Sequence, residues 1–223
     1  MKNGSYFKKG FNLIDISTPL YNDMEKYPSL EGFQLQWIRT IGEKDKLNMS
    51  RIAMESHVGT HVDAPLHFIE NGKSIDQMPL QNLFGAAQVL DVPYPETVTG
   101  EFLRGKHLGT HILLFKFGEK RYNRDFDYFD FTAVDYLLQN DVKVIGTDNF
   151  TIDSKKTKYD IHQSILKNEI WVVEGLNLTN VIPGVYEFIC LPLSIKSAEG
   201  SPARAVLLKR EHSCNEIKPK LKK

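Results

Sequence analysis

Cysteine is scarce in this sequence, which has only Cys190 and Cys214 among its 223 residues. Two isolated cysteines cannot form the disulfide framework of a small secreted protein, so the composition indicates a reducing compartment. Cys190 lies in the apolar segment 188–191, where we expect it to be a buried small hydrophobic side chain.

The sequence also lacks an excess of charge of either sign, because 28 acidic residues balance 28 basic ones. This balance argues against nucleic acid or an anionic membrane as a partner. A lysine-rich stretch at 218–223 is the local exception, and we interpret it as a solvated terminus. No apolar run is long enough for a membrane helix, and the first residues lack a signal peptide's apolar stretch. We therefore expect a cytoplasmic protein.

The length of 223 residues suits a single domain, 1–223. Short runs rich in Val, Ile and Phe alternate with loops and predict strands. The predicted strands are 11–16, 33–38, 86–92, 111–117, 142–146, 170–173, 187–193 and 203–208. Helices are predicted from a Thr132 cap to about 139, with Val134, Leu137 and Leu138 on one face, and over 160–167. A strand follows each helix, which predicts some parallel crossovers in a strand-dominated, mixed α/β fold.

The most informative segment is 56–68, which holds three of the seven histidines together with one aspartate. His57, His61, Asp63 and His67 all occupy odd positions. In an extended chain, alternate residues point to the same face, so these four side chains would converge. We therefore predict an extended segment here that directs all four groups into one space.

A helix would not bring the same groups together. Asp63 would be rotated by roughly 200° from His61 around a helix, and Gly59 and Pro65 disfavour one. Two imidazoles and a carboxylate are ligands that suit Zn²⁺ and Mn²⁺, and three protein ligands leave a position for water, as catalytic metals require. The alternative is a polar cluster without a metal at the edge of a strand.

A second segment repeats the local pattern His-x-Gly-Thr-His at residues 107–111. Leu113 stands where the first segment has its carboxylate, and an apolar strand follows. We therefore interpret His107 and His111 as structural or surface residues rather than metal ligands.

Residues 57–68 read HVGTHVDAPLHF, and this motif resembles the signature of the cyclase-like metal-dependent hydrolase family. That family includes bacterial kynurenine formamidases (arylformamidases) and isatin hydrolases. Further segments that resemble the family are 15–17 with 19–20, 146–148 with Asp153, His162, 171–176 and 200–205.

The resemblance implies a role for each site residue. His57, His61 and Asp63 would hold a first metal together with Glu174. Asp63 and Glu174 would bridge to a second metal, which His162 completes. His67 would be the catalytic acid and base. Taken without the resemblance, His162 and Glu174 would be an ordinary helix-surface histidine and strand-end carboxylate.

The resemblance further implies two divalent cations per subunit, Zn or Mn, in a swivelling β/α/β fold that forms a homodimer or homotetramer. Where kynurenine formamidases carry a substrate-contacting tryptophan beside Pro-Gly-Asp, this chain has Tyr27-Pro28-Ser29. Tyr27 still offers an aromatic face to a substrate. Thr151 replaces the serine that is usual in the central segment. Asp148 could either orient a ligand or form an Asx turn.

These features predict a metal-dependent amidohydrolase that resembles arylformamidases, which convert N-formylkynurenine to kynurenine and formate in tryptophan catabolism. Another carbonyl ring-opening hydrolase, acting on an isatin-like lactam or a lactone, or a dehydratase, is the enzymatic alternative. A non-catalytic protein that binds a metal or a small molecule, or one in which a metal only stabilises the fold, is the alternative from another class.

Overall fold

The computed structural model describes residues 11–93, 95–118 and 128–210. Cys214 and the lysine-rich stretch 218–223 lie outside these residues. The expected burial of Cys190 is confirmed, and burial raises the pKa of its thiol to about 12. No helix in the described part of the chain is long and apolar enough to cross a membrane.

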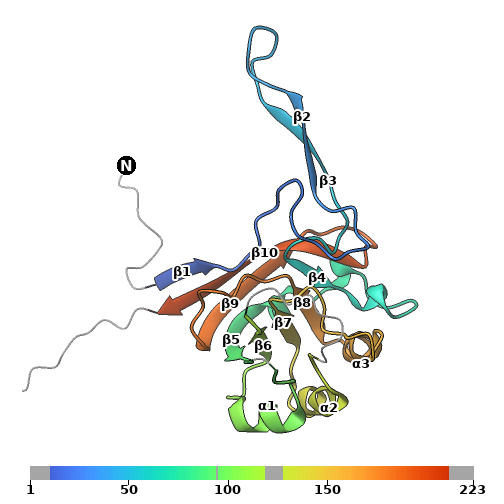
Figure 1. Cartoon of the computed structure of the whole chain (residues 1–223), viewed down its shortest axis with the longest axis vertical. Helices are drawn as coiled ribbons and strands as arrows, with labels where there is room; N and C mark the ends of the chain where they lie inside the picture. Colours follow the sequence, from blue (N-terminus) through green and yellow to red (C-terminus); the bar gives the residue numbers. More distant parts are fainter. Residues whose placement is uncertain (1–10, 94, 119–127, 211–223) are drawn as a thin grey trace, which may run out of the picture.

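The described strands of the main sheet close into a barrel. They are β1 (Phe11–Asp15), β4 (His61–Asp63), β5 (Phe84–Asp91), β6 (Ile112–Lys116), β7 (Val144–Thr147), β8 (Trp171–Glu174), β9 (Gly184–Pro192) and β10 (Gly200–Arg210). Their order is β1-β10-β4-β8-β7-β6-β5-β9, and β10 pairs with β9 as well. The extra pairing closes the ring, and β1 extends it as a strand beside β10 (Figure 1).

One half of the barrel is parallel, as the sequence predicts. Strands β5, β6, β7 and β8 pair in parallel, and the connections between them pass through α1 (Gly100–Lys106), α2 (Phe131–Gln139) and α3 (Asp160–Lys167). The other pairs are antiparallel. Figure 1 shows the helices on the outer side of the parallel strands. The predicted mixed α/β fold is thus confirmed.

Two apolar cores lie on the two faces of the parallel strands. Leu114 and Val173 belong to the core inside the barrel, whereas Leu113 and Val172 pack against the helices. Neighbouring residues of a strand point to opposite faces, so a strand covered on both faces must be apolar throughout. This explains why these strands stand out in the sequence as continuous apolar runs.

The sequence misplaces one helix cap and misses some short elements. Asp130, not Thr132, caps α2, because its carboxylate accepts the backbone N–H of Ala133 at 2.9 Å. Val134 and Leu137 are buried as expected of the inner face, whereas Leu138 is 40% exposed. The unpredicted elements are α1, β3 (Met49–Ala53), and the 3₁₀ turns η1 (Pro65–His67), η2 (Ile75–Gln77) and η3 (Leu80–Leu83). The helix and the turns are short, and every residue of β3 is exposed, so none of these elements shows a clear apolar pattern in the sequence.

A separate hairpin, residues 34–53, projects from the barrel, and we call it the arm (Figure 1). It consists of β2 (Gln34–Arg39) and β3, which pair with each other in the antiparallel direction. Neither strand pairs with a described strand of the barrel. Asn22 forms two hydrogen bonds with the backbone of Leu35, and Glu55 accepts the backbone N–H of Gly32, so the base of the arm is held to the body.

A close backbone contact joins the end of β8 to the loop before β4. Gly175 has φ +66°, and a Cβ atom there would lie 2.2 Å from the carbonyl oxygen of Gly59. Both the positive φ and the contact require glycine. Since Glu174 precedes Gly175, this contact also sets the distance between Glu174 and the loop that contains His57.

We expect Gly175→Ala to lower the free energy of unfolding by about 2 kcal/mol or more, because it adds both strain and a clash. Gly105→Ala in α1 is the matched control: its Cβ would have no described neighbour within 4 Å. The control should be neutral or stabilise the protein by up to about 1 kcal/mol. Urea unfolding measures both changes, and an unchanged midpoint for Gly175→Ala would contradict the prediction.

Candidate metal centre

The register of the sheet brings His61 and Glu174 together. Strand β4 runs antiparallel to β8, and His61 lies directly opposite Glu174 in this pair. Side chains of directly opposite residues share a face and are close enough to interact. Asp63 is on the same face of β4 as His61, while Val62 points into the barrel core. Two neighbouring strands thus place two carboxylates and an imidazole in one space.

The expectation that residues 57–67 form one extended segment is wrong outside β4. His57 lies in a turn, in which Gly59 has φ +70°, and His67 ends the 3₁₀ turn η1. Pro65 begins η1, where its fixed φ suits a helical turn. The four side chains still converge, because these two turns fold back toward β4. The rings of His57 and His67 stack with their centroids 3.9 Å apart.

The first group of ligand atoms surrounds one oxygen of Asp63. Its Oδ1 lies 2.9 Å from His57 Nδ1 and 3.4 Å from His61 Nε2. The ligand atoms of these three residues all lie within 4.8 Å of one another. This spacing is small enough for one cation to contact all three.

The second group lies on the other side of the same carboxylate. Asp63 Oδ2 is 3.6 Å from His162 Nε2, which in turn is 3.1 Å from Glu174 Oε1. Glu174 Oε2 is 3.6 Å from His61 Nε2, so this carboxylate also lies between two imidazoles. The structure therefore brings together all five residues for which the sequence predicts metal binding.

The second nitrogen of two imidazoles is held by the protein. His162 Nδ1 lies 2.5 Å from Asp153 Oδ2, and the same oxygen accepts the backbone N–H of His162 at 3.1 Å. His61 Nδ1 is 2.9 Å from the carbonyl oxygen of Gly59, to which it can only donate. A hydrogen bond of this kind fixes the ring and turns the other nitrogen toward a metal.

Sequence reasoning assigned no role to Asp153 or Glu199, and both contact the centre. Asp153 lies nine residues before His162, and only the fold of the loop between them creates the contact. Glu199 Oε1 is 3.3 Å from His57 Nε2, which is buried and has no hydrogen bond within the described residues. Asp153 belongs to a segment that resembles the family, but the sequence did not indicate its contact with His162, and no sequence signal pointed to Glu199.

The electrostatics of the centre favour positive charge. Burial lowers the pKa of His61, but its hydrogen bonds to Asp63 and Glu174 outweigh that effect and raise it to about 10. Burial likewise opposes the charge on His162, whereas Glu174 and Asp153 raise its pKa to about 10. Buried carboxylates require a nearby positive charge, which a divalent cation can supply. Three imidazoles and two carboxylates also match the ligand types of Zn²⁺ and Mn²⁺, so these residues fit such ions.

His67 has a different environment from the other histidines. It belongs to neither group of ligand atoms, and burial lowers its pKa to about 4. Its ring lies between His57 and Phe68, with centroids 3.9 and 4.1 Å away. His67 is thus neutral near pH 7 and has a ring nitrogen that can accept a proton.

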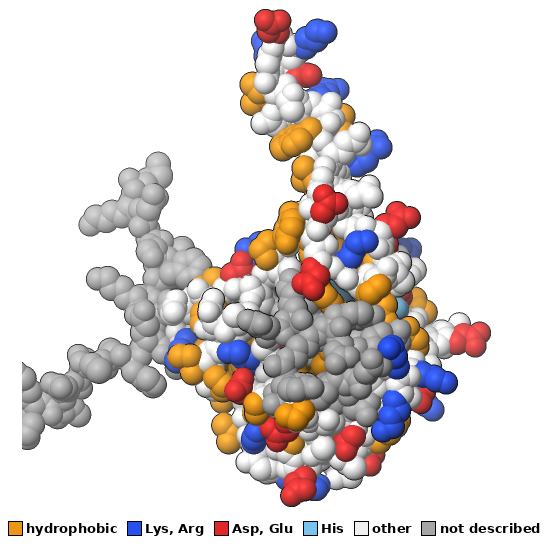
Figure 2. Space-filling view, in the orientation of Figure 1, with side chains coloured by type: hydrophobic (Ala, Val, Ile, Leu, Met, Phe, Trp, Pro, Cys, Tyr) orange, Lys and Arg blue, Asp and Glu red, His pale blue; other side chains and the backbone are white. Residues whose placement is uncertain are grey.

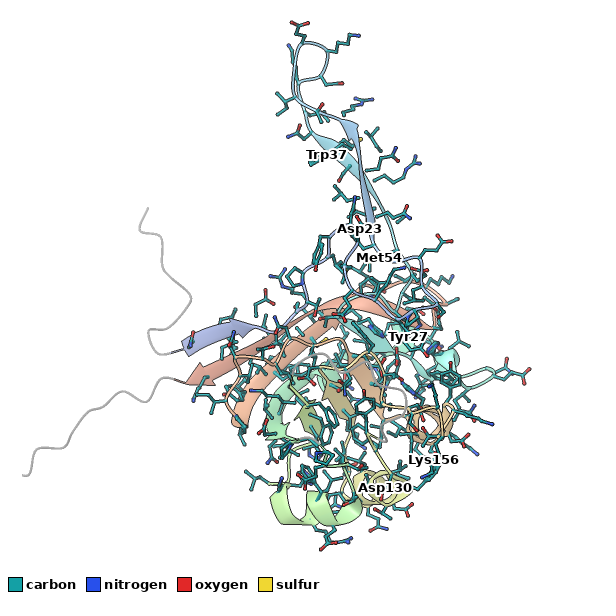
Figure 3. All side chains as sticks on the ribbon, viewed as in Figure 1. Asp23, Tyr27, Trp37, Met54, Asp130 and Lys156 are labelled. Atoms are coloured by element: carbon teal, nitrogen blue, oxygen red, sulfur yellow. The ribbon has the colours of Figure 1, made fainter. Side chains whose placement is uncertain are left out.

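The centre forms the floor of a cavity of about 230 Å³. Four histidines and Glu174 supply its polar lining, and much of the remaining lining is aromatic. The aromatic side chains are those of Tyr27, Phe68, Phe150 and Tyr159. Figure 3 shows Tyr27 beside the barrel, below the arm. The structure thus places Tyr27, the predicted substrate contact, in the same cavity as the candidate ligands, together with Thr151.

The remaining candidates do not line this cavity. His107 contacts Tyr136 and the backbone of Thr110, and His111 contacts the backbone of Asp141, as expected of structural or surface residues. Asp148 accepts the backbone N–H groups of Phe117 and Gly118, at 2.9 and 3.1 Å, and burial raises its pKa to about 6. Asp148 therefore anchors a loop.

Comparisons with known proteins agree with this geometry. The Cyclase family model matches residues 14–154. Cyclase-like protein 3 of Oryza sativa subsp. japonica is 31% identical over 90% of this chain and 81% of its own length. The kynurenine formamidase of Bacillus anthracis is 32% identical over 87% of this chain and 96% of its own length.

Solved structures with the same fold include two hydrolases. A protein from Bacillus stearothermophilus, described as a predicted metal-dependent hydrolase, is 26% identical with a TM-score of 0.77, and the match covers 90% of this chain and 99% of that one. Isatin hydrolase A from Labrenzia aggregata is 20% identical, with a TM-score of 0.74 over 90% of this chain and 94% of that one. The second likeness shows the fold alone.

We expect Asp153→Asn to weaken binding of Zn²⁺ or Mn²⁺ by about tenfold to 100-fold, because a neutral partner orients His162 less firmly and makes it less basic. Competition with a chelator of known affinity measures the loss. Asp135→Asn, on the exposed face of α2, is the matched control and should bind as wild type does. Equal affinities for wild type and Asp153→Asn would show that this contact does not support metal binding.

Proposed function

The chain belongs to the Cyclase family and is a metal-dependent hydrolase, and from this premise we propose that it hydrolyses the amide C–N bond of an aryl formamide. N-formylkynurenine is the substrate we propose, with kynurenine and formate as products. The observation that supports this most is one cavity whose lining combines candidate metal ligands, a neutral histidine and several aromatic side chains.

We propose that two divalent cations, Zn²⁺ or Mn²⁺, bind each subunit. His57, His61 and Asp63 would hold one ion, and Asp63, His162 and Glu174 would hold the other. Such ions supply a nucleophilic water near neutral pH and polarise a carbonyl oxygen. Asp63 supports the two-ion proposal, because one of its oxygens faces each group of imidazoles.

The aromatic side of the cavity would bind the aryl ring of the substrate. Phe68 packs against the ring of His162 at 4.9 Å and against Tyr159 at 5.3 Å, so it joins the polar and apolar parts of the cavity. A flat ring placed against Tyr27 and Tyr159 would direct its formamide group toward the histidines. This arrangement orients the scissile bond and excludes water from the rest of the cavity.

His67 would move the proton. Being neutral, it accepts a proton from the attacking water and then donates it to the amine nitrogen as the C–N bond breaks. The carbonyl carbon keeps the water oxygen and leaves as formate, while the nitrogen leaves as the arylamine. His61 and His162 cannot serve in this way, because their nitrogens face the carboxylates of the centre.

A cyclic amide is the second candidate substrate. Tyr27 and Ser29 line the cavity at the position where kynurenine formamidases carry a different sequence. This departure changes the wall that contacts the aryl group and leaves the candidate ligands untouched. An isatin-like lactam, or a lactone, would present its carbonyl group to the same centre.

One preparation of the purified protein tests these proposals. Elemental analysis gives the identity and number of bound ions, and the same sample is assayed with N-formylkynurenine, isatin and simple lactones. We expect metal and the fastest turnover with N-formylkynurenine. Faster turnover of isatin or a lactone would transfer the assignment to that substrate, and no turnover of any aryl formamide, lactam or lactone by the metal-loaded protein would refute the proposal.

His67→Ala should lower kcat by about 100-fold to 10,000-fold while it leaves the metal content close to that of wild type. The reason is that His67 would transfer the proton but contributes to neither group of ligand atoms. His111→Ala, which removes an exposed histidine, is the matched control and should keep wild-type activity. Elemental analysis and initial rates measure both effects. If activity survived in His67→Ala, the proton transfer assigned to His67 would be wrong.

A further inference from the structure

One wall of the cavity comes from a loop without regular secondary structure. Residues 20–33, which we call the wall loop, contain no helix or strand, and Tyr27, Ser29 and Leu30 of this loop line the cavity. Figure 2 shows charged side chains of both signs at the base of the arm, where the wall loop lies. Since no strand pairing holds this loop, individual contacts determine where the wall stands.

The carboxylate of Glu55 holds the wall loop through two hydrogen bonds. Its Oε1 accepts the backbone N–H of Glu31 at 2.6 Å, and its Oε2 accepts that of Gly32 at 2.9 Å. Two successive N–H groups that point to one place form a binding site for an anion, and Gly32 has φ +93°, which glycine adopts without strain. Hydrogen bonds to a charged acceptor are about twice as strong as those between neutral groups. The contact therefore fixes the backbone just after the residues that line the cavity.

The segment that carries Glu55 also carries a candidate metal ligand. Glu55 precedes His57 by two residues, and Val58 is buried in a small apolar cluster with Met24 and Phe33 of the wall loop. One short segment thus contacts the loop through Glu55 and Val58, and the candidate centre through His57. A displacement of the loop relative to this segment would change the space between the wall and the candidate ligands.

Two other contacts of the wall loop lead elsewhere. Asn22 forms hydrogen bonds with the backbone of Leu35 at the base of the arm, and Lys26 donates one to the carbonyl oxygen of Leu30. The first contact connects the loop to the arm, and the second connects the loop to itself. The carboxylate of Glu55, in contrast, connects the loop to the segment that leads into the candidate centre.

We propose that Glu55 is a positioning residue for substrate binding, which sets the distance between the wall loop and the candidate metal centre. Glu55 is not among the described residues that line the cavity, so it acts through the loop and not through contact with the substrate. The wall loop contributes to neither group of ligand atoms and does not contain His67. Loss of the contact therefore weakens substrate binding and leaves the chemical step unchanged. The effect on substrates rests on the proposed function, whereas the contact itself does not.

Kinetics of Glu55→Gln and Glu55→Ala test the proposal, with Glu31→Gln as the matched control. Glutamine keeps one acceptor oxygen and alanine has none, while the control removes a neighbouring exposed charge and leaves both acceptors in place. The substrate is whichever of N-formylkynurenine, isatin and simple lactones wild type hydrolyses fastest. We expect KM to rise roughly tenfold in Glu55→Gln and further in Glu55→Ala, with kcat within roughly twofold of wild type. KM of Glu31→Gln should equal that of wild type.

Hydrogen exchange of the metal-loaded protein without substrate gives a second readout. We expect the backbone amides of Glu31 and Gly32 to exchange roughly tenfold faster in both Glu55 variants, because they lose their acceptor. The amides of Val172 and Val173 in β8 should exchange as in wild type. Circular dichroism and metal content should also stay at wild-type values; if Glu55→Ala fails this check, Glu55→Gln, which has nearly the same size, decides the question.

The other outcomes separate the failure of this proposal from that of the proposed function. Faster exchange with an unchanged KM would overturn the proposal, because the loop would not control substrate binding. Lower kcat or metal content with an unchanged KM would overturn it as well, because Glu55 would act through His57. A wild type that hydrolyses none of these substrates would refute the proposed function instead. In that case unchanged exchange of the two amides would overturn the role of Glu55 in holding the loop, and faster exchange would support it.

Discussion

Asp63 and Glu174 are carboxylates that the fold buries almost completely, and much of the surrounding structure balances their charge. A buried carboxylate without a positive partner costs several kcal/mol. Here His57, His61 and His162 surround the two carboxylates, and Asp153 and the carbonyl oxygen of Gly59 hold two of those imidazoles from behind. The same arrangement that satisfies the carboxylates also creates a place for cations. Stability and function therefore depend on the same charges.

The barrel makes this arrangement possible because its two halves meet at the centre. Strand β8 is the last of the parallel strands, and β4 pairs with it in the antiparallel direction and joins it to β10. Glu174 comes from the parallel half, while Asp63 comes from the antiparallel half. Helix α3, which precedes β8, adds His162. Ligands from three elements are thus placed by backbone pairing and core packing, which hold them more rigidly than loops would.

The candidate proton carrier differs from the candidate ligands in its surroundings, not in its chemistry. His61 and His67 are both imidazoles on neighbouring elements, but carboxylates raise the pKa of His61 to about 10, whereas burial lowers that of His67 to about 4. His67 is thus neutral near pH 7 and offers an acceptor nitrogen, whereas the carboxylates around His61 attract positive charge. The immediate surroundings of each histidine thus distinguish the candidate ligand from the candidate proton carrier.

The sequence by itself determined most of the strands, the parallel crossovers and the concentration of His57, His61, Asp63 and His67, because apolar periodicity and residue type are local properties. It also indicated the family through the motif at 57–68. Only the tertiary structure decided how these residues meet: through turns on either side of a three-residue strand rather than one extended segment. The contacts of Asp153 and Glu199 were likewise decided there. The contact of Glu199 with His57 joins segments far apart in the chain, and that of Asp153 with His162 depends on how the loop between them folds, and no local pattern records either.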